Sequence, residues 1–111
     1  MLRKILLLVL CVILLCSRVN AEEAPVAVLM KGIGSLSCAH WRSTRATRTE
    51  GIIWILGFWT GLNYVAAASE QTQPKADERE IVTEVEKSCA QSSSQALGSA
   101  VWTAYLNFSK K

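Results

Sequence analysis

Two cysteines, Cys38 and Cys89, lie on either side of a strongly apolar stretch at residues 52–68 and are the only cysteines after residue 21. Because they form a single pair, their connectivity is settled if they pair at all. An oxidising compartment would favour that bond, which closes a loop of 51 residues and contributes roughly 4 kcal/mol in the chain-entropy model. This pattern predicts a small exported domain tied by one disulfide.

Residues 1–21 have the three parts of a secretory signal peptide. Arg3 and Lys4 form a positively charged start, an apolar run follows at residues 5–16, and Val19 and Ala21 occupy the −3 and −1 positions. We therefore expect cleavage after Ala21 and export to the periplasm. An uncleaved membrane anchor is the alternative, although the apolar run is shorter than the ~20 residues that span a bilayer.

The net charge changes when this segment is removed. Loss of Arg3, Lys4 and Arg18 reduces the 12 basic residues to 9, which equals the 9 acidic residues. A neutral mature chain gives no support for nucleic-acid binding. A group of arginines and a group of glutamates remain, which form either solvated helix faces or complementary docking patches. The glutamates are Glu78, Glu80, Glu84 and Glu86. Candidate partner-binding residues among the arginines are Arg42, Arg45 and Arg48.

Residues 51–68 are predicted to form the main helix of the domain. Thr47 and Glu50 fit a capping box in front of it, and its first half is apolar on every face, so it must be buried in protein or in lipid. Gly57 and Gly61 lie four residues apart, which predicts that a neighbouring helix crosses closely there. We favour a soluble core helix over membrane insertion, because the apolar run is short and interrupted by polar residues.

Shorter helices are predicted on both sides of the main helix. The first begins at Ser35 or Ser37, another is capped by Asp77 and turns Cys89 toward the core, and the last follows a cap at Ser92. The expected fold is therefore all-α, a small bundle of about four helices around a central apolar helix, closed by one disulfide. The expected organisation is a signal peptide at 1–21, an irregular leader at 22–34 and one helical domain at 35–111. Predicted packing residues are Trp41, Trp54, Gly57, Phe58, Gly61, Asn63, Val101 and Tyr105.

The chain carries little that suggests catalysis. His40 is the only histidine, no nucleophile motif accompanies it, and the acidic pairs lie on a polar helix face. A structural zinc site normally takes four Cys or His ligands, so we expect no metal. We also expect no cofactor and no enzymatic activity. The four tryptophans are expected mainly in the core. Tryptophan is also enriched at interface anchors, and Trp59 is our candidate for a partner contact.

Three short motifs resemble those of a known family. They are LSCAHW at 36–41, WILGFWTGLN at 54–63, and VEKSC at 85–89 followed by ALGSA at 96–100. In this order they are similar to the Rap/Tai-type periplasmic immunity proteins of type VI secretion and, more distantly, to the acid-stress chaperones HdeA and HdeB. The segment at 91–94 departs from the family pattern, in which a proline is expected.

The resemblance implies an HdeA-like helical fold and a protein-binding function. An immunity protein would occlude a peptidoglycan-cleaving effector, such as a cell-wall amidase. An HdeA-like chaperone would instead bind unfolded clients in acid, through protonation of its carboxylates. A membrane-associated structural protein that uses residues 52–68 is the third alternative, and a homodimer is an open alternative to a monomer.

Overall fold

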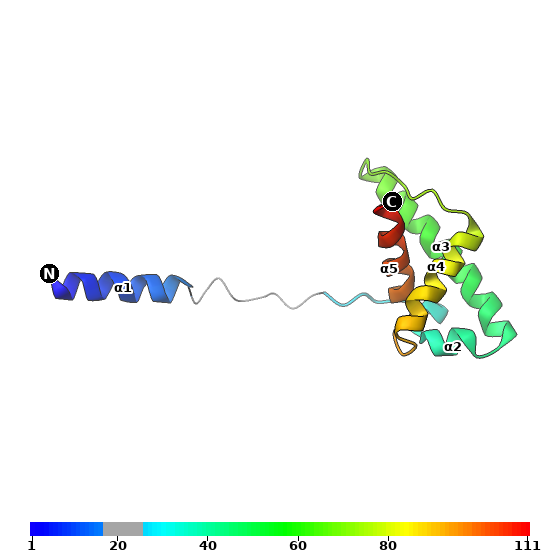
Figure 1. Cartoon of the computed structure of the whole chain (residues 1–111), viewed down its shortest axis with the longest axis horizontal. Helices are drawn as coiled ribbons and strands as arrows, with labels where there is room; N and C mark the ends of the chain where they lie inside the picture. Colours follow the sequence, from blue (N-terminus) through cyan, green and yellow to red (C-terminus); the bar gives the residue numbers. More distant parts are fainter. Residues whose placement is uncertain (17–25) are drawn as a thin grey trace.

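The computed structural model describes residues 1–16 and 26–111, so the expected cleavage after Ala21 lies outside the described residues. Figure 1 shows an N-terminal helix and a helical domain that ends at the C-terminus. The elements are α1 (Leu2–Cys16), the 3-10 helix η1 (Gly32–Ser35), α2 (Cys38–Arg42), α3 (Arg45–Ala68), α4 (Glu78–Gln91) and α5 (Leu97–Ser109). Within the described residues the chain is all-α, as predicted, and its one β-feature is an isolated bridge between Ser37 and Ala96.

Helix α3 begins six residues earlier than predicted. Thr44 is its N-cap, and the side chains of Thr44 and Thr47 each accept a hydrogen bond from the backbone N–H of the other residue, at 3.1 Å in both directions. The predicted capping box of Thr47 and Glu50 is therefore wrong. A hydroxyl at the third helical position replaces the usual Glu or Gln, so the true start of α3 does not match the usual capping-box sequence.

The last helix also begins differently from the prediction. Its N-cap is Ala96, which makes no side-chain cap bond, and not Ser92. The side chain of Gln95 points toward α4 and not toward Ser92, and its Nε2 donates to the carbonyl oxygen of Ser88 at 2.7 Å. The side chain of Gln95 thus satisfies a carbonyl in the last turn of α4. The predicted caps at Ser37 and Asp77 are confirmed.

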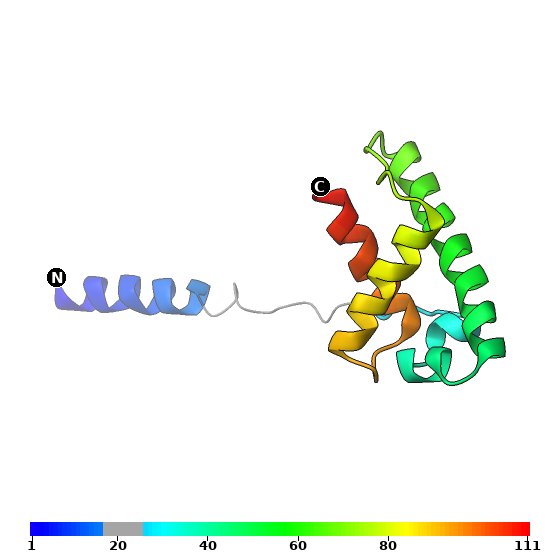
Figure 2. The same ribbon diagram turned by 45° about the vertical axis from the view of Figure 1, so that its right-hand side comes forward.

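Helices α3, α4 and α5 lie side by side, with α2 near one end of this group (Figure 2). Their contact surface is a single apolar core that includes both disulfide cysteines. Trp41, Ile55, Val85, Leu97 and Val101 are fully buried in it. Burial of such side chains supplies most of the free energy that holds short helices together.

The disulfide between Cys38 and Cys89 is present, as predicted, and joins α2 to α4 with a Cα–Cα distance of 5.5 Å. Backbone bonds run beside it: the N–H of Cys38 donates to Gln95 O at 2.9 Å, and the N–H of Leu97 donates to Leu36 O at 2.8 Å. The segments before α2 and before α5 are therefore held together both covalently and by a short ladder.

The packed part of the chain begins before residue 35. Ile33 and Gly34, which we placed in the irregular leader, are buried in η1. Gly32 has a φ of +71°, in the left-handed region that favours glycine, and this turn directs η1 onto the domain. The end of the leader is thus part of the core.

Within the described part of this chain, no helix makes the close crossing predicted at Gly57 and Gly61. Both are exposed, and among the described residues no neighbouring side chain or element lies within 4 Å of a Cβ built at either position. The glycines that permit close approach are Gly34, where a Cβ would overlap the Trp54 ring, and Gly51, where it would overlap the Trp41 ring. Within this chain, the close approach to α3 is therefore at Gly51, on a different side of the helix from Gly57 and Gly61.

Helix α3 packs on one side only. Gly51, Ile55, Trp59 and Ala66 are its buried residues. By length and composition alone it is long and apolar enough to cross a bilayer, and 22% of its most apolar window is buried. The core helix of a soluble protein can have the same length and hydropathy, so these properties do not show what covers the exposed side of α3.

Candidate functional site

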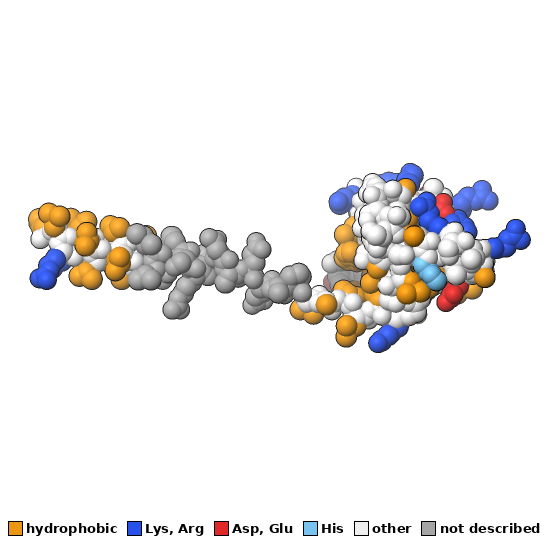
Figure 3. Space-filling view, turned by 90° about the horizontal axis from the view of Figure 1, so that it is seen from below, with side chains coloured by type: hydrophobic (Ala, Val, Ile, Leu, Met, Phe, Trp, Pro, Cys, Tyr) orange, Lys and Arg blue, Asp and Glu red, His pale blue; other side chains and the backbone are white. Residues whose placement is uncertain are grey.

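An apolar groove of about 410 Å³ lies between the leader, α3 and α5. Figure 3 shows hydrophobic side chains gathered on the part of the domain where the described residues before η1 join it. Small hydroxyl side chains from α5 supply its few polar atoms. The groove is lined by Val28, Met30, Phe58, Gly98, Ser99, Trp102 and Thr103.

The leader forms one wall of the groove because the domain holds it in place. Trp54 Nε1 donates a hydrogen bond to the carbonyl oxygen of Lys31 at 3.0 Å. Gly98 lacks a side chain where Met30 lies against α5, so the leader approaches that helix closely. The opposite wall is fixed by Phe58, whose ring lies 5.1 Å from that of Trp54. The groove is therefore built on packed elements and not on a free loop.

Trp102 is the exposed aromatic residue of the groove, with 47% of its surface accessible. Its ring lies nearly parallel to that of Tyr105, with centroids 6.3 Å apart, which supports one face of the indole. A half-exposed tryptophan beside an apolar groove is typical of an interface anchor. Beyond its residue type, nothing in the sequence distinguished Trp102 from the other tryptophans.

Trp59, our candidate for a partner contact, is a core residue: it is 3% exposed and packs edge-on against Tyr105 and Phe108. Tyr105 in turn donates its hydroxyl to Asn63 Oδ1 at 3.1 Å, which ties α5 to α3. Burial raises the pKa of Tyr105. Asn63 and Tyr105 were predicted as packing residues and make this contact between α3 and α5, whereas burial leaves Trp59 inaccessible to a partner.

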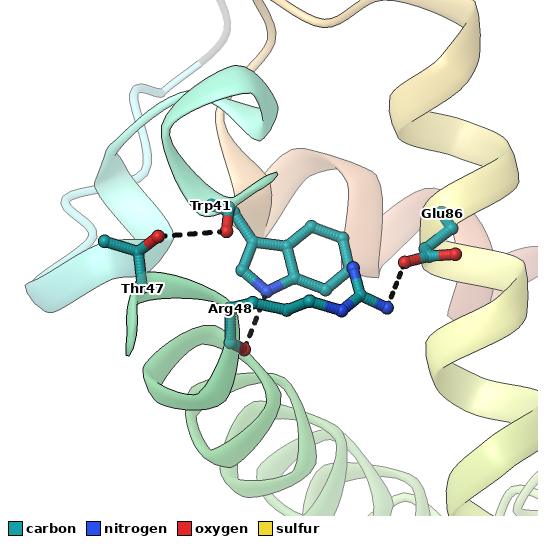
Figure 4. A network of polar contacts seen from close by, with 4 residues as sticks. All are labelled: Trp41, Thr47, Arg48 and Glu86. Atoms are coloured by element: carbon teal, nitrogen blue, oxygen red, sulfur yellow. Dashed lines mark hydrogen bonds and ion pairs between the residues drawn. The ribbon is translucent and has the colours of Figure 1, made fainter. Parts of the chain in front are cut away.

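The three candidate arginines have different environments. Arg42 and Arg45 are exposed. Arg48 forms an ion pair with Glu86 of α4 and lies over the ring of Trp41 (Figure 4). One member of the arginine group therefore meets one member of the glutamate group within the same chain, which leaves Arg42 and Arg45 as candidates for contact with a partner.

The remaining polar groups show no arrangement for catalysis within the described residues. His40 is exposed on α2, and no group of three His, Cys, Asp or Glu side chains in that part of the chain is placed to hold a metal ion. Asp77 has a lowered pKa because it accepts a hydrogen bond from the backbone N–H of Glu80. That bond is part of a helix cap, so the shift has a structural cause.

Comparison of the chain with protein-family models, curated proteins and solved structures gave no match. The function is therefore inferred from the groove and its half-exposed tryptophan.

Proposed function

We propose that this chain is an exported periplasmic protein that binds one partner protein through the groove beside Trp102. The observation that carries this proposal is the half-exposed Trp102 beside an apolar groove of about 410 Å³. Aromatic side chains in such positions supply much of the binding energy of protein interfaces. The resemblance to Rap/Tai-type immunity proteins suggests that the partner is a peptidoglycan-cleaving effector.

Two further features support an exported protein. Disulfides persist in oxidising compartments such as the periplasm, and the Cys38–Cys89 bond lies in the core. The N-terminal helix α1 exposes apolar side chains along its described length, among them Leu2, Leu6 and Val9. An apolar segment of this kind suits recognition by an export machinery and is removed in the mature protein.

For the test, the full chain is expressed with a tag, and the protein that accumulates after export is purified. Tagged protein is used to capture partners from periplasmic extract at neutral and at acidic pH, and a captured protein is then purified and titrated separately. Trp102→Ala is expected to weaken binding by at least tenfold. Leu106→Ala, an exposed substitution on the same helix outside the groove, is expected to leave binding unchanged.

An immunity role requires that the wild type, but not Trp102→Ala, blocks peptidoglycan cleavage by the purified partner. Equal binding by wild type and Trp102→Ala would overturn the assignment of the groove. Capture of many unfolded clients only in acid would replace immunity with an acid-chaperone role. Recovery of the protein solely from membranes would favour the membrane-associated alternative.

A further inference from the structure

The outer side of α3 is an unpartnered apolar face that the groove does not use. Ile53 and Tyr64 are 69% and 76% exposed on it, although such residues are usually at least partly covered in a soluble domain. Figure 2 shows α3 along an edge of the domain, so its outer side is accessible along its length. The face comprises Ala46, Glu50, Ile53, Gly57, Gly61, Tyr64 and Ala68, all exposed.

From this face we infer that α3 pairs with α3 of a second copy, antiparallel, about a two-fold axis at Gly57. The seven residues are spaced symmetrically around Gly57: Ile53 and Gly61 lie four residues to either side, and Glu50 and Tyr64 lie seven. A two-fold axis at Gly57 therefore places each residue opposite its counterpart in the other copy. Such self-complementarity is what an isologous interface requires.

The facing residues complement one another in size. Ile53 of one copy meets Gly61 of the other, so a large side chain enters the space that a missing side chain leaves. Gly57 meets Gly57 at the axis, where the two backbones come closest. The structure leaves that space open, because no other element approaches a Cβ built at Gly57 or Gly61 among the described residues.

The polar groups are also complementary in the antiparallel orientation. Arg45, at the start of α3, comes near Glu70 of the other copy, which follows the end of the helix, and both side chains are exposed. The N-terminal end of each helix dipole also lies beside the C-terminal end of its partner. Glu50, the one charged residue within the face, lies opposite the hydroxyl of Tyr64, which can donate to its carboxylate. A parallel arrangement would instead place Arg45 beside Arg45.

Cysteine cross-linking tests the axis directly. This test rests on the proposed export: once residues 1–21, with Cys11 and Cys16, have been removed, the Cys38–Cys89 bond leaves an introduced cysteine as the one free thiol. Gly57→Cys is expected to form a disulfide-linked dimer under mild oxidation, because each copy brings the same residue to the axis. Lys87→Cys, on the exposed side of α4, is the control and is expected to remain largely monomeric. Ala46→Cys mixed with Ala68→Cys is expected to cross-link, whereas neither variant alone should do so.

Mass measurement by light scattering completes the test. The wild type is expected at twice the protomer mass, and Gly57→Leu is expected as a folded monomer, because the space around Gly57 within one protomer is open. Circular dichroism checks that this variant is folded. A monomeric wild type at every concentration tested, or equal cross-linking of Gly57→Cys and Lys87→Cys, would overturn the inference. So would retention of the wild type in membranes, since the face would then meet lipid.

Discussion

Arg48 and Trp41 hold each other through two different contacts. The guanidinium carbon of Arg48 lies 5.1 Å from the centroid of the Trp41 ring, while Trp41 Nε1 donates to the backbone carbonyl oxygen of Arg48 at 3.1 Å. The guanidinium also pairs with Glu86, so this contact joins α2, α3 and α4. Trp41 is fully buried, and the pair therefore closes the end of the core next to the disulfide.

Removal of the Arg48 side chain should destabilise the domain moderately. Arg48→Ala loses a cation–π contact and a partly exposed ion pair. We therefore expect the free energy of unfolding, measured in urea, to decrease by about 1–2 kcal/mol. Glu86→Gln removes the ion pair alone and should cost about 0.5 kcal/mol or less, with an effect that shrinks as salt rises. The backbone hydrogen bond from Trp41 survives both changes. A larger loss from Glu86→Gln than from Arg48→Ala would contradict this division.

The disulfide should contribute more than any single polar contact. It closes a loop of 51 residues that contains α3 and most of α4, and a loop of this size gives roughly 2–4 kcal/mol of stabilisation. Cys38→Ser, or reduction of the wild type, should therefore lower the urea midpoint clearly. Because Cys38 is fully buried, the double alanine variant is the better control, since it leaves no buried hydroxyl. Equal stability of oxidised and reduced protein would exclude this contribution.

The fold class and the disulfide could be predicted because their signals are local and redundant. Helical spacing placed Ile81, Val85 and Cys89 on one buried face of α4, and all three are buried. The pairing of Cys38 with Cys89 needed no geometry, because they are the only two cysteines after residue 21. The caps at Ser37 and Asp77 followed from side chains that bond to their own backbone neighbours.

The contacts of α3 could not be predicted in the same way. Its first half is apolar on every side, so periodicity did not separate the buried side, with Ile55 and Trp59, from the open side, with Ile53 and Gly57. Trp59 and Trp102 were equivalent in the sequence, and only the tertiary arrangement distinguishes them. The apolar residues Val28 and Met30 of the leader were the one available signal that this segment contributes to a binding surface.

Two glycines of α3 should respond in opposite directions to the same substitution. Gly51→Ala places a methyl group against the buried ring of Trp41, and we expect a loss of about 1–3 kcal/mol. Gly57→Ala meets open space and removes a poor helix former, and we expect a gain of about 0.5–1 kcal/mol. Urea unfolding at high dilution, where self-association is weakest, measures both. Similar effects of the two substitutions would show that the close approach at Gly51 is not a constraint.

The cap at Asp77 should make stability depend on acid pH. Its carboxylate accepts a bond of 2.8 Å from the backbone N–H of Glu80, which lowers its pKa in the folded chain below the ordinary value of 3.8. A folded-state pKa below the unfolded value means that the stabilisation is fully present above the unfolded pKa. It is lost as the pH falls through the folded pKa. The melting temperature of the wild type should therefore decrease when the pH is lowered below about 4.

Asp77→Asn separates this titration from the cap itself. Asparagine caps helices about as well as aspartate but does not ionise, so the variant should match the wild type at low pH and lie slightly below it at neutral pH, where the charge also favours the helix N-terminus. The difference between the two melting curves as a function of pH therefore isolates the carboxylate of Asp77. A constant difference from pH 2 to pH 7 would show that the charge at this cap contributes nothing.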